Sequence, residues 1–312
     1  MIKIYRTDDR SIHEEDKIQE GVWIQMIHPT REEAMQVAEE LDIDIDDIMA
    51  ALDEEESSHI DYDDDFRQTL VIVDYPSADD KRAYTTIPLG IILLQNMIIT
   101  VCTEDTPILH RFVKGRVKEF STKKKMRFVY QILFRAASLY QAYLRVLDKR
   151  RVEIEERIEG DTEDVDLMAL HELESTLVYF ATSLRANGVV LDRLTRYKRL
   201  EQYPEDQELL DDVIIENKQA IEMTSIYRDI INSTRELLSS VIDSRLNNVM
   251  KYLTSITIVM AIPTVISGLY GMNVNLGGMP FASSLQGFGI VCIIILLICI
   301  LALWLLRKKK ML

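Results

Sequence analysis

Charge is absent from a long stretch near the end of this sequence. The 55 residues from Tyr252 to Leu306 contain no Asp, Glu, Lys, Arg or His, which excludes a wholly soluble protein. Basic residues are also scarce elsewhere: apart from the tail Arg307-Lys308-Lys309-Lys310, residues 1–251 hold 32 basic and 51 acidic side chains, a net charge of −19. Because phosphate needs a basic face, this balance argues against a nucleic-acid partner. Residues 1–251 are long enough for the cores of one or two domains.

Cysteine and glycine are scarce as well. Only Cys102, Cys292 and Cys299 occur, without a C-x-x-C spacing, so neither a disulfide framework nor a cysteine metal site is expected and a reducing compartment is indicated. Five of the eleven glycines precede residue 268, and none of them forms a phosphate-binding loop. The first residues lead directly into charged sequence, so we expect no secretory signal. We find no catalytic site and predict that the protein is not an enzyme.

The apolar stretch divides into two predicted membrane spans, residues 250–270 and 287–306, because each has about the length that crosses a bilayer. Residues 271–286 form the loop between them. Basic residues flank the pair, with Arg245 and Lys251 at the start of the first span and Arg307–Lys310 after the second. The positive-inside rule then predicts a cell-membrane protein with both termini in the cytoplasm and an external loop. The alternative is that the two stretches are buried core helices.

The remaining sequence changes character at about residue 122. Before it, apolar runs rich in β-branched residues predict strands, and two short segments between them predict helices. The predicted strands are 22–27, 69–75, 85–94 and 97–103, and the predicted helices are 30–41 and 47–52. After residue 122 the apolar residues recur with a period near 3.6, which predicts one helix to about residue 158 and another from about 164 to 200.

A very long helix is predicted next. Residues 205–267 contain no Gly, and their one Pro is Pro263, so they predict one continuous helix of ~60 residues, roughly 95 Å long. Propensity alone does not stabilise such a helix, so it is expected to pack against the two preceding helices or against copies of itself, which makes an oligomer the expectation.

The predicted fold class is therefore α+β, with a cytoplasmic α/β domain and long helices that lead into a two-helix transmembrane domain. The four predicted domains are an acidic α/β domain (1–121), a helical hairpin (122–203), a stalk helix (204–249) and the transmembrane domain (250–312).

Polar and small residues recur every three or four positions along the membrane part of this helix, which places them on one face. They are Asn247, Met250, Thr254, Thr257, Ala261, Thr264 and Gly268, with Leu253 beside them. One interpretation is that small residues let membrane helices approach closely. The other is that several copies surround an axis and this face lines a pore. The pattern alone does not decide between them.

The sequence Tyr270-Gly271-Met272-Asn273 at the end of the first span resembles the Gly-Met-Asn motif of the CorA family of divalent-cation transporters. The resemblance covers nearly the whole chain, from the acidic α/β domain to the Lys-rich end. Further local matches are Tyr227-Arg228-Asp229, Asn248-Val249-Met250-Lys251 and His171-Glu172-Leu173.

This resemblance implies a homopentamer in the lipid bilayer that takes up Mg²⁺, with Co²⁺ or Ni²⁺ as further cargo, driven by the membrane potential. Gly271, Met272 and Asn273 would form the ion-selectivity motif, in which amide oxygens accept hydrogen bonds from the water shell of the ion. The implied pore-lining residues are Asn247, Met250 and Leu253 at the inner constriction, then Thr257, Ala261, Thr264 and Gly268.

The resemblance also implies that Mg²⁺ bound between cytoplasmic domains closes the pore. Asp212 falls at the family's acidic position in the stalk helix, with Asp211 and Glu216 nearby. The usual acidic partner pair reads Met49-Ala50 here, so either the acidic run 53–56 substitutes for it or the site is built differently. The loop after Asn273 carries no charge, which leaves the identity of the transported ion open.

Two other functions remain in view. One is a zinc transporter, or a transporter of another divalent cation, with the same fold, including a proton-coupled one; the lack of ionisable residues in the spans argues against proton coupling. The other is a membrane-tethered metal sensor or scaffold that transports nothing.

Overall fold

The computed structural model describes residues 1–8, 11–78, 84–160, 164–197, 203–272, 280–281, 286–309 and 311. The chain forms two compact units, Met1–Thr234 and Arg235–Leu312, and each is considered by itself. Asn273 and most of the predicted external loop lie outside the described residues.

The first unit is built on one seven-stranded sheet with the strand order β2-β1-β3-β7-β6-β5-β4. The strands are β1 Ile2–Asp8, β2 Ser11–Glu15, β3 Trp23–Ile27, β4 His59–Asp63, β5 Gln68–Ala78, β6 Tyr84–Leu93 and β7 Ile98–Cys102. β3 and β7 are parallel, and the other neighbours are antiparallel. The central strands are covered on both faces, which explains why they read as nearly continuous apolar runs.

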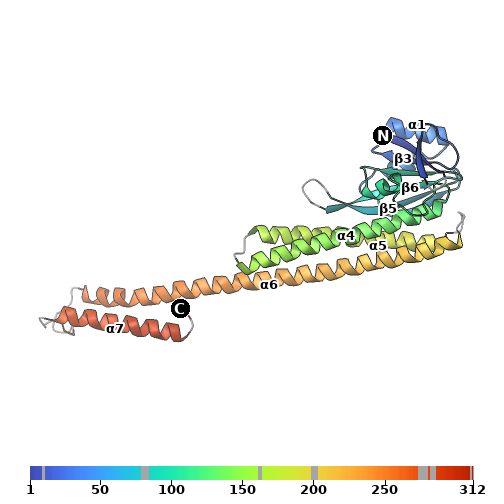
Figure 1. Ribbon diagram of the computed structural model, residues 1–312. Helices are drawn as coiled ribbons and strands as arrows, with labels where there is room; N and C mark the ends of the chain where they lie inside the picture. Colours follow the sequence, from blue (N-terminus) through green and yellow to red (C-terminus); the bar gives the residue numbers. More distant parts are fainter. Residues whose placement is uncertain are drawn as a thin grey trace. The chain divides into compact units, whose positions relative to one another are not determined.

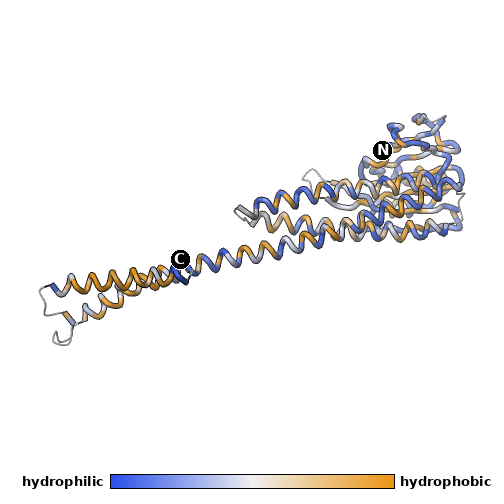
Figure 2. Tube along the Cα trace, turned by 60° about the horizontal axis from the view of Figure 1, so that its bottom comes forward, coloured by the Kyte–Doolittle hydropathy of each residue, from blue (hydrophilic) through white to orange (hydrophobic). Residues whose placement is uncertain are grey.

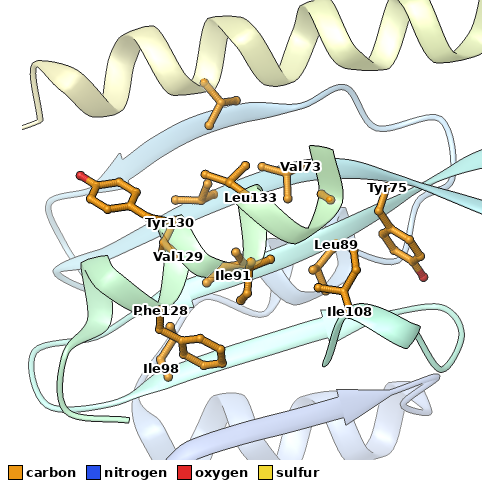
Figure 3. Close-up of a cluster of buried hydrophobic side chains, with 14 of the residues drawn as sticks. Val73, Tyr75, Leu89, Ile91, Ile98, Ile108, Phe128, Val129, Tyr130 and Leu133 are labelled. Carbon is orange, nitrogen blue, oxygen red and sulfur yellow. The ribbon is translucent and has the colours of Figure 1, made fainter. Parts of the chain in front are cut away.

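Helices cover the two faces of the sheet and give it two hydrophobic cores (Figure 1). α1 (Arg31–Leu41) and α2 (Ile45–Ala50) pack on one face, and α4 (Lys125–Gly160) and α5 (Asp164–Thr195) pack on the other. The core between the sheet and the helices α4 and α5 is the larger of the two. In Figure 3, Val73, Leu89 and Ile91 from β5 and β6 lie beside Phe128 and Leu133 of α4.

An aromatic cluster anchors α4 to the sheet. The ring of Trp23 contacts the rings of Phe112, Phe120 and Phe128 edge-on at centroid distances of 6.4, 6.1 and 5.0 Å. Its buried Nε1–H donates to Thr100 Oγ1 over 2.8 Å. Edge-on pairs add about 0.5–1.5 kcal/mol beyond their buried area, so this cluster fixes the start of α4 against β3.

Side-chain caps define the short helices. Thr30 and Glu33 form a capping box at α1, with Thr30 N–H donating to Glu33 Oε2 over 2.9 Å and Glu33 N–H donating to Thr30 Oγ1 over 3.2 Å. Asp44 caps α2, and Thr106 caps α3 (Pro107–Val113). The prediction placed the second helix at residues 47–52, two residues late, because it overlooked the cap at Asp44.

The long helix α6 runs without a break over Pro204–Tyr270, 67 residues, which confirms the prediction of one continuous helix. Its start belongs to the first unit, where Leu210 and Val213 are buried in the larger core. In the second unit, α7 (Gly287–Lys308) lies beside the C-terminal part of α6 (Figures 1 and 2).

The four predicted strands correspond to β3, β5, β6 and β7, and the two long helices after residue 122 correspond to α4 and α5. The predicted break after residue 158 was wrong in detail, because α4 continues through Gly160. The analysis of the sequence missed β1, β2, β4 and α3. The division into four domains remains a prediction.

Candidate ion pathway

Two helices of the second unit are long and apolar enough to cross a membrane. In both, the most apolar window of 18 residues is only 6% buried. Figure 2 shows α7 and the last part of α6 as the most hydrophobic parts of the trace. A helix that is apolar all round and has no protein cover matches a lipid environment, whereas a core helix of a soluble protein would be mostly buried. The interpretation as core helices is therefore wrong.

The membrane part of α6 has one face turned to α7. Ser255 on this face is fully buried, and Val259, Ile262 and Ile266 are partly covered. These positions are four, three and four residues apart, so they lie on one side of the helix.

The polar and small stripe lies on the opposite side. With 3.6 residues per turn, Met250, Leu253 and the four further positions predicted to line a pore lie between about 160° and 240° around the helix from Ser255. These four positions are Thr257, Ala261, Thr264 and Gly268, and all six residues are exposed in the single chain. Asn247 and Thr254 are exposed too, but they lie at the flank of the stripe. The packing of α7 against α6 thus leaves the stripe uncovered.

The threonines of the stripe are satisfied within their own helix. Thr257 Oγ1 donates to the carbonyl of Leu253 over 2.8 Å, and Thr264 Oγ1 donates to the carbonyl of Met260 over 2.9 Å. Each hydroxyl oxygen keeps its acceptor capacity. An open groove beside them is lined by Ile256, Thr257, Met260, Ala261, Thr264 and Val265. This face therefore offers neutral oxygen acceptors along an otherwise apolar surface.

Pro263 interrupts the hydrogen bonding of α6 inside the membrane segment. Because proline has no N–H, the carbonyl of Val259 loses its usual partner four residues later. The thiol of Cys299 on α7 lies 3.9 Å from this carbonyl oxygen and is a weak donor to it. The sequence pattern predicted no role for Cys299, although the proline four residues after Val259 was a signal that a donor is needed there.

The C-terminal turn also contacts α6. Ser255 Oγ donates to the carbonyl of Met311 over 3.1 Å, and Lys308 Nζ lies 5.3 Å from the centre of the Trp304 ring. The analysis of the sequence also missed Ser255, which is one position away from the residues of the polar stripe. Its hydrogen bond holds Met311, which follows α7, against the N-terminal part of the predicted first span.

The end of α6 carries the Gly-Met-Asn motif. Gly271 N–H donates to the carbonyl of Ser267 over 2.9 Å and closes the last turn, while Met272 is exposed. Tyr270 Oη donates to the carbonyl of Pro280 over 2.7 Å, so the tyrosine ties the end of α6 to Pro280. The third residue of the motif, Asn273, lies outside the described residues.

The predicted regulatory residues lie near the start of α6. Asp211 and Asp212 are exposed, and Asp211 accepts a hydrogen bond from Gln207 Nε2 over 3.4 Å. Glu216 is half-buried against α4, where its Oε1 accepts from Ser138 Oγ over 3.2 Å. Within the described part of the chain, no three His, Cys, Asp or Glu side chains come together as a metal site. A single copy thus brings Asp212 and Glu216 to one helix face but does not complete a site.

Comparisons with known proteins agree with this geometry. Residues 19–308 match the family described as CorA-like Mg²⁺ transporter protein. The chain is 29% identical to the cobalt/magnesium transport protein CorA of Methanocaldococcus jannaschii over 92% of this chain and 90% of that protein. It is 22% identical to the magnesium transport protein CorA of Helicobacter pylori over 81% and 80% of the two chains. The complete structure of the M. jannaschii CorA magnesium transporter superposes with a TM-score of 0.86 at 26% identity, covering 99% of this chain and 98% of the other.

Proposed function

The chain belongs to the CorA-like Mg²⁺ transporter family, and from that premise we propose that it is a passive, gated channel for Mg²⁺ uptake across the cell membrane. Copies of the chain, five by the family resemblance, surround an axis with the stripe of α6 facing inward. Both termini lie in the cytoplasm. Co²⁺ is a second cargo, as the name of the M. jannaschii relative suggests.

This proposal rests on the difference between two faces of α6. The apolar face packs on α7, while Thr257, Ala261 and Thr264 stay exposed on the other side. If α7 faces lipid, the stripe is the surface left for contact between copies, where a ring of neutral oxygens and small side chains leaves room for an ion with water around it.

At the external end we assign Gly271, Met272 and Asn273 to ion selection. Mg²⁺ gives up its water reluctantly, and a ring of amide oxygens accepts hydrogen bonds from that water shell without removing it. The hydrogen bond from Tyr270 to Pro280 supports this role, because it fixes the helix end on which the motif stands.

Membrane potential is the proposed driving force. A divalent cation that moves inward through 100 mV gains about 4.6 kcal/mol, twice the value for a single charge, so uptake needs no ATP. The described membrane segments contain no Asp, Glu, Lys, Arg or His between Tyr252 and Leu306, which favours a channel over a proton-coupled carrier.

We assign regulation to Mg²⁺ bound at Asp212, with Asp211 and Glu216 beside it, and ligands from a second copy complete the site. Each copy carries a net charge of −15, so bound divalent ions would hold neighbouring cytoplasmic domains together, and their loss would let the domains separate.

Ion flux into liposomes tests the proposed channel. Purified protein is reconstituted, a potential is imposed, and uptake of Mg²⁺, Co²⁺, Ni²⁺ and Zn²⁺ is measured separately at several pH values. We expect potential-dependent Mg²⁺ uptake without pH dependence, and Asn273→Ala should lower it by about tenfold or more because the selectivity ring is lost.

Asn232→Ala is the control, because it removes an amide outside the membrane segment and does not touch the pathway. Asn247→Ala is less suitable, because Asn247 lies on the same predicted pathway. Equal Mg²⁺ flux with and without Asn273→Ala would contradict the pore assignment and favour a sensor or scaffold. Zn²⁺ flux that exceeds Mg²⁺ flux and follows pH would favour the zinc transporter.

A further inference from the structure

Two arginines share a small pocket on the outer side of the first unit. The pocket, of about 180 Å³, lies between α3 and α4 and is lined by Pro107, Ile108, Arg111, Arg135, Ser138, Leu139 and Ala142. Its volume is roughly six times the 30 Å³ share of one water molecule in the liquid, so a small polyatomic ion fits with a few waters.

Neither arginine has a carboxylate partner there. Among the residues that the structure describes, no ion pair engages the side chain of Arg111 or Arg135. The Nε atom of Arg135 is fully buried and has no described hydrogen-bond partner. A buried donor left without an acceptor destabilises the fold, and a second cation beside it adds repulsion.

The neighbours of Arg135 disfavour its positive charge, which a bound anion would stabilise. Burial lowers the pKa of Arg135, and the adjacent positive charge of Arg111 lowers it further. The Arg135 guanidinium stands 5.9 Å from the centre of the Phe112 ring, which offers only a weak cation–π contact. The hydroxyl of Ser138, also in the pocket wall, already donates to Glu216. Two guanidinium groups are thus the available donors of the pocket.

An arginine pair without a carboxylate partner is unusual in a chain with so many acidic residues. The whole chain carries 51 acidic and 36 basic residues, and other arginines of the same unit are paired: Arg127 with Asp206 and Glu119, and Arg151 with Asp148 and Glu155. Arg111 and Arg135 instead line one pocket, and an anion from outside the chain would neutralise both.

We propose that this pocket binds a phosphate group, held by the guanidinium groups of Arg111 and Arg135. The planar fork of arginine matches the geometry of phosphate oxygens and forms paired, charge-assisted hydrogen bonds with them. The phosphate is either inorganic phosphate or a phosphate of a nucleotide. The site does not depend on the proposed ion pathway, since all its lining residues lie in the first unit.

Calorimetric titration of the purified full-length protein tests this site. Inorganic phosphate and ATP are titrated in separate arms at constant ionic strength and without Mg²⁺. We expect binding in at least one arm, weakened by about tenfold or more in Arg111→Gln and in Arg135→Gln. Tighter binding of ATP than of inorganic phosphate identifies the nucleotide as the source, and the reverse identifies the free ion.

Arg145→Gln is the matched control, because Arg145 is exposed on the same helix and its loss changes the net charge equally. Arg111 is exposed as well, so its variant keeps the fold even if Arg135→Gln does not. The proposal is overturned if neither anion binds, or if Arg145→Gln weakens binding as much as Arg111→Gln. It is also overturned if the arginine variants change the oligomeric state while no anion binds, since the arginines would then hold a carboxylate of another copy.

Discussion

At Gly90 the sheet leaves no room for a side chain. A Cβ atom at this position of β6 would come within 2.2 Å of the Cβ of buried Ala51, which follows α2. Asp74, on neighbouring β5, is a different kind of exception: a mostly buried carboxyl group between the apolar residues Val73 and Tyr75. Both residues show how closely the helices are fitted to the sheet.

Gly90→Ala should therefore destabilise the first unit by about 1–3 kcal/mol, the usual cost of overpacking a core. Thermal unfolding of the purified protein measures the change. Gly188→Ala is the matched control, because its Cβ would meet only the side-chain nitrogen of Asn217, at 3.4 Å, and alanine is the better helix former. A similar loss of stability in both variants would show that the contact with Ala51 is not the cause.

Asp74 should make stability depend on pH. Burial raises the pKa of the Asp74 carboxyl group, although hydrogen bonds from Ser183 and Ser58 oppose the shift. Since the folded-state pKa lies above the unfolded one, the protein loses stability as pH rises from the ordinary Asp value of about 3.9 through the folded value. In Asp74→Asn this loss should disappear, so the melting temperature of the variant should rise relative to wild type with increasing pH. A constant difference between the two across this range would contradict the prediction.

The two helices of the second unit differ in their surfaces. α7 is apolar on all sides, whereas α6 has one face for α7 and one that stays uncovered. Thr264 and Val265 are neighbours in sequence but point about 100° apart around α6, and only Thr264 lies in the uncovered stripe.

Thr264→Leu should reduce Mg²⁺ flux by about tenfold or more, because a ring of leucines makes a hydrophobic constriction that excludes water. Ile266→Leu changes a residue on the face of α6 turned to α7 and should leave the flux nearly unchanged. Liposome uptake under an imposed potential measures both. If the two substitutions reduce flux equally, the stripe does not line the pathway.

The buried elements were easier to predict than the exposed ones. β5, β6 and β7 are covered on both faces and are recognisable in the sequence as apolar runs. The missed strands β2 and β4 form the two edges of the sheet, where Ser-Ile-His-Glu-Glu and His-Ile-Asp-Tyr-Asp read as polar segments. α3 has only seven residues, too few for a clear period.

The candidate site was predictable to a similar degree. A period of three or four placed Thr257, Ala261 and Thr264 on one face, but only the packing of α7 distinguishes that face from the others. The pocket with Arg111 and Arg135 was not predictable, because its residues are 24 positions apart and belong to two helices whose contact no local pattern encodes.

For the whole molecule, the central feature is that one helix carries both proposed roles. α6 begins in the core of the first unit, bears Asp212 and Glu216, and ends at the motif after Tyr270. A change at the regulatory residues therefore acts on the same hydrogen-bonded element that lines the proposed pore.

Asp212→Ala should raise Mg²⁺ flux by roughly fivefold or more when the cytoplasmic side holds high Mg²⁺, the lower range of typical allosteric couplings, and should change flux little when that side is free of Mg²⁺. Asp229→Ala, another exposed carboxylate on α6, is the control. Unchanged flux in Asp212→Ala at high Mg²⁺ would remove the regulatory assignment and leave the pore proposal intact.

The edges of the sheet have a consequence for how copies of the chain meet. Glu14 and Glu15 lie on the β2 edge, and Asp61 and Asp63 lie on the β4 edge. Negative charges along both margins disfavour strand-to-strand joining of identical domains. If copies assemble as proposed, the two sheet edges are therefore poor surfaces for contact between them, because like charges repel.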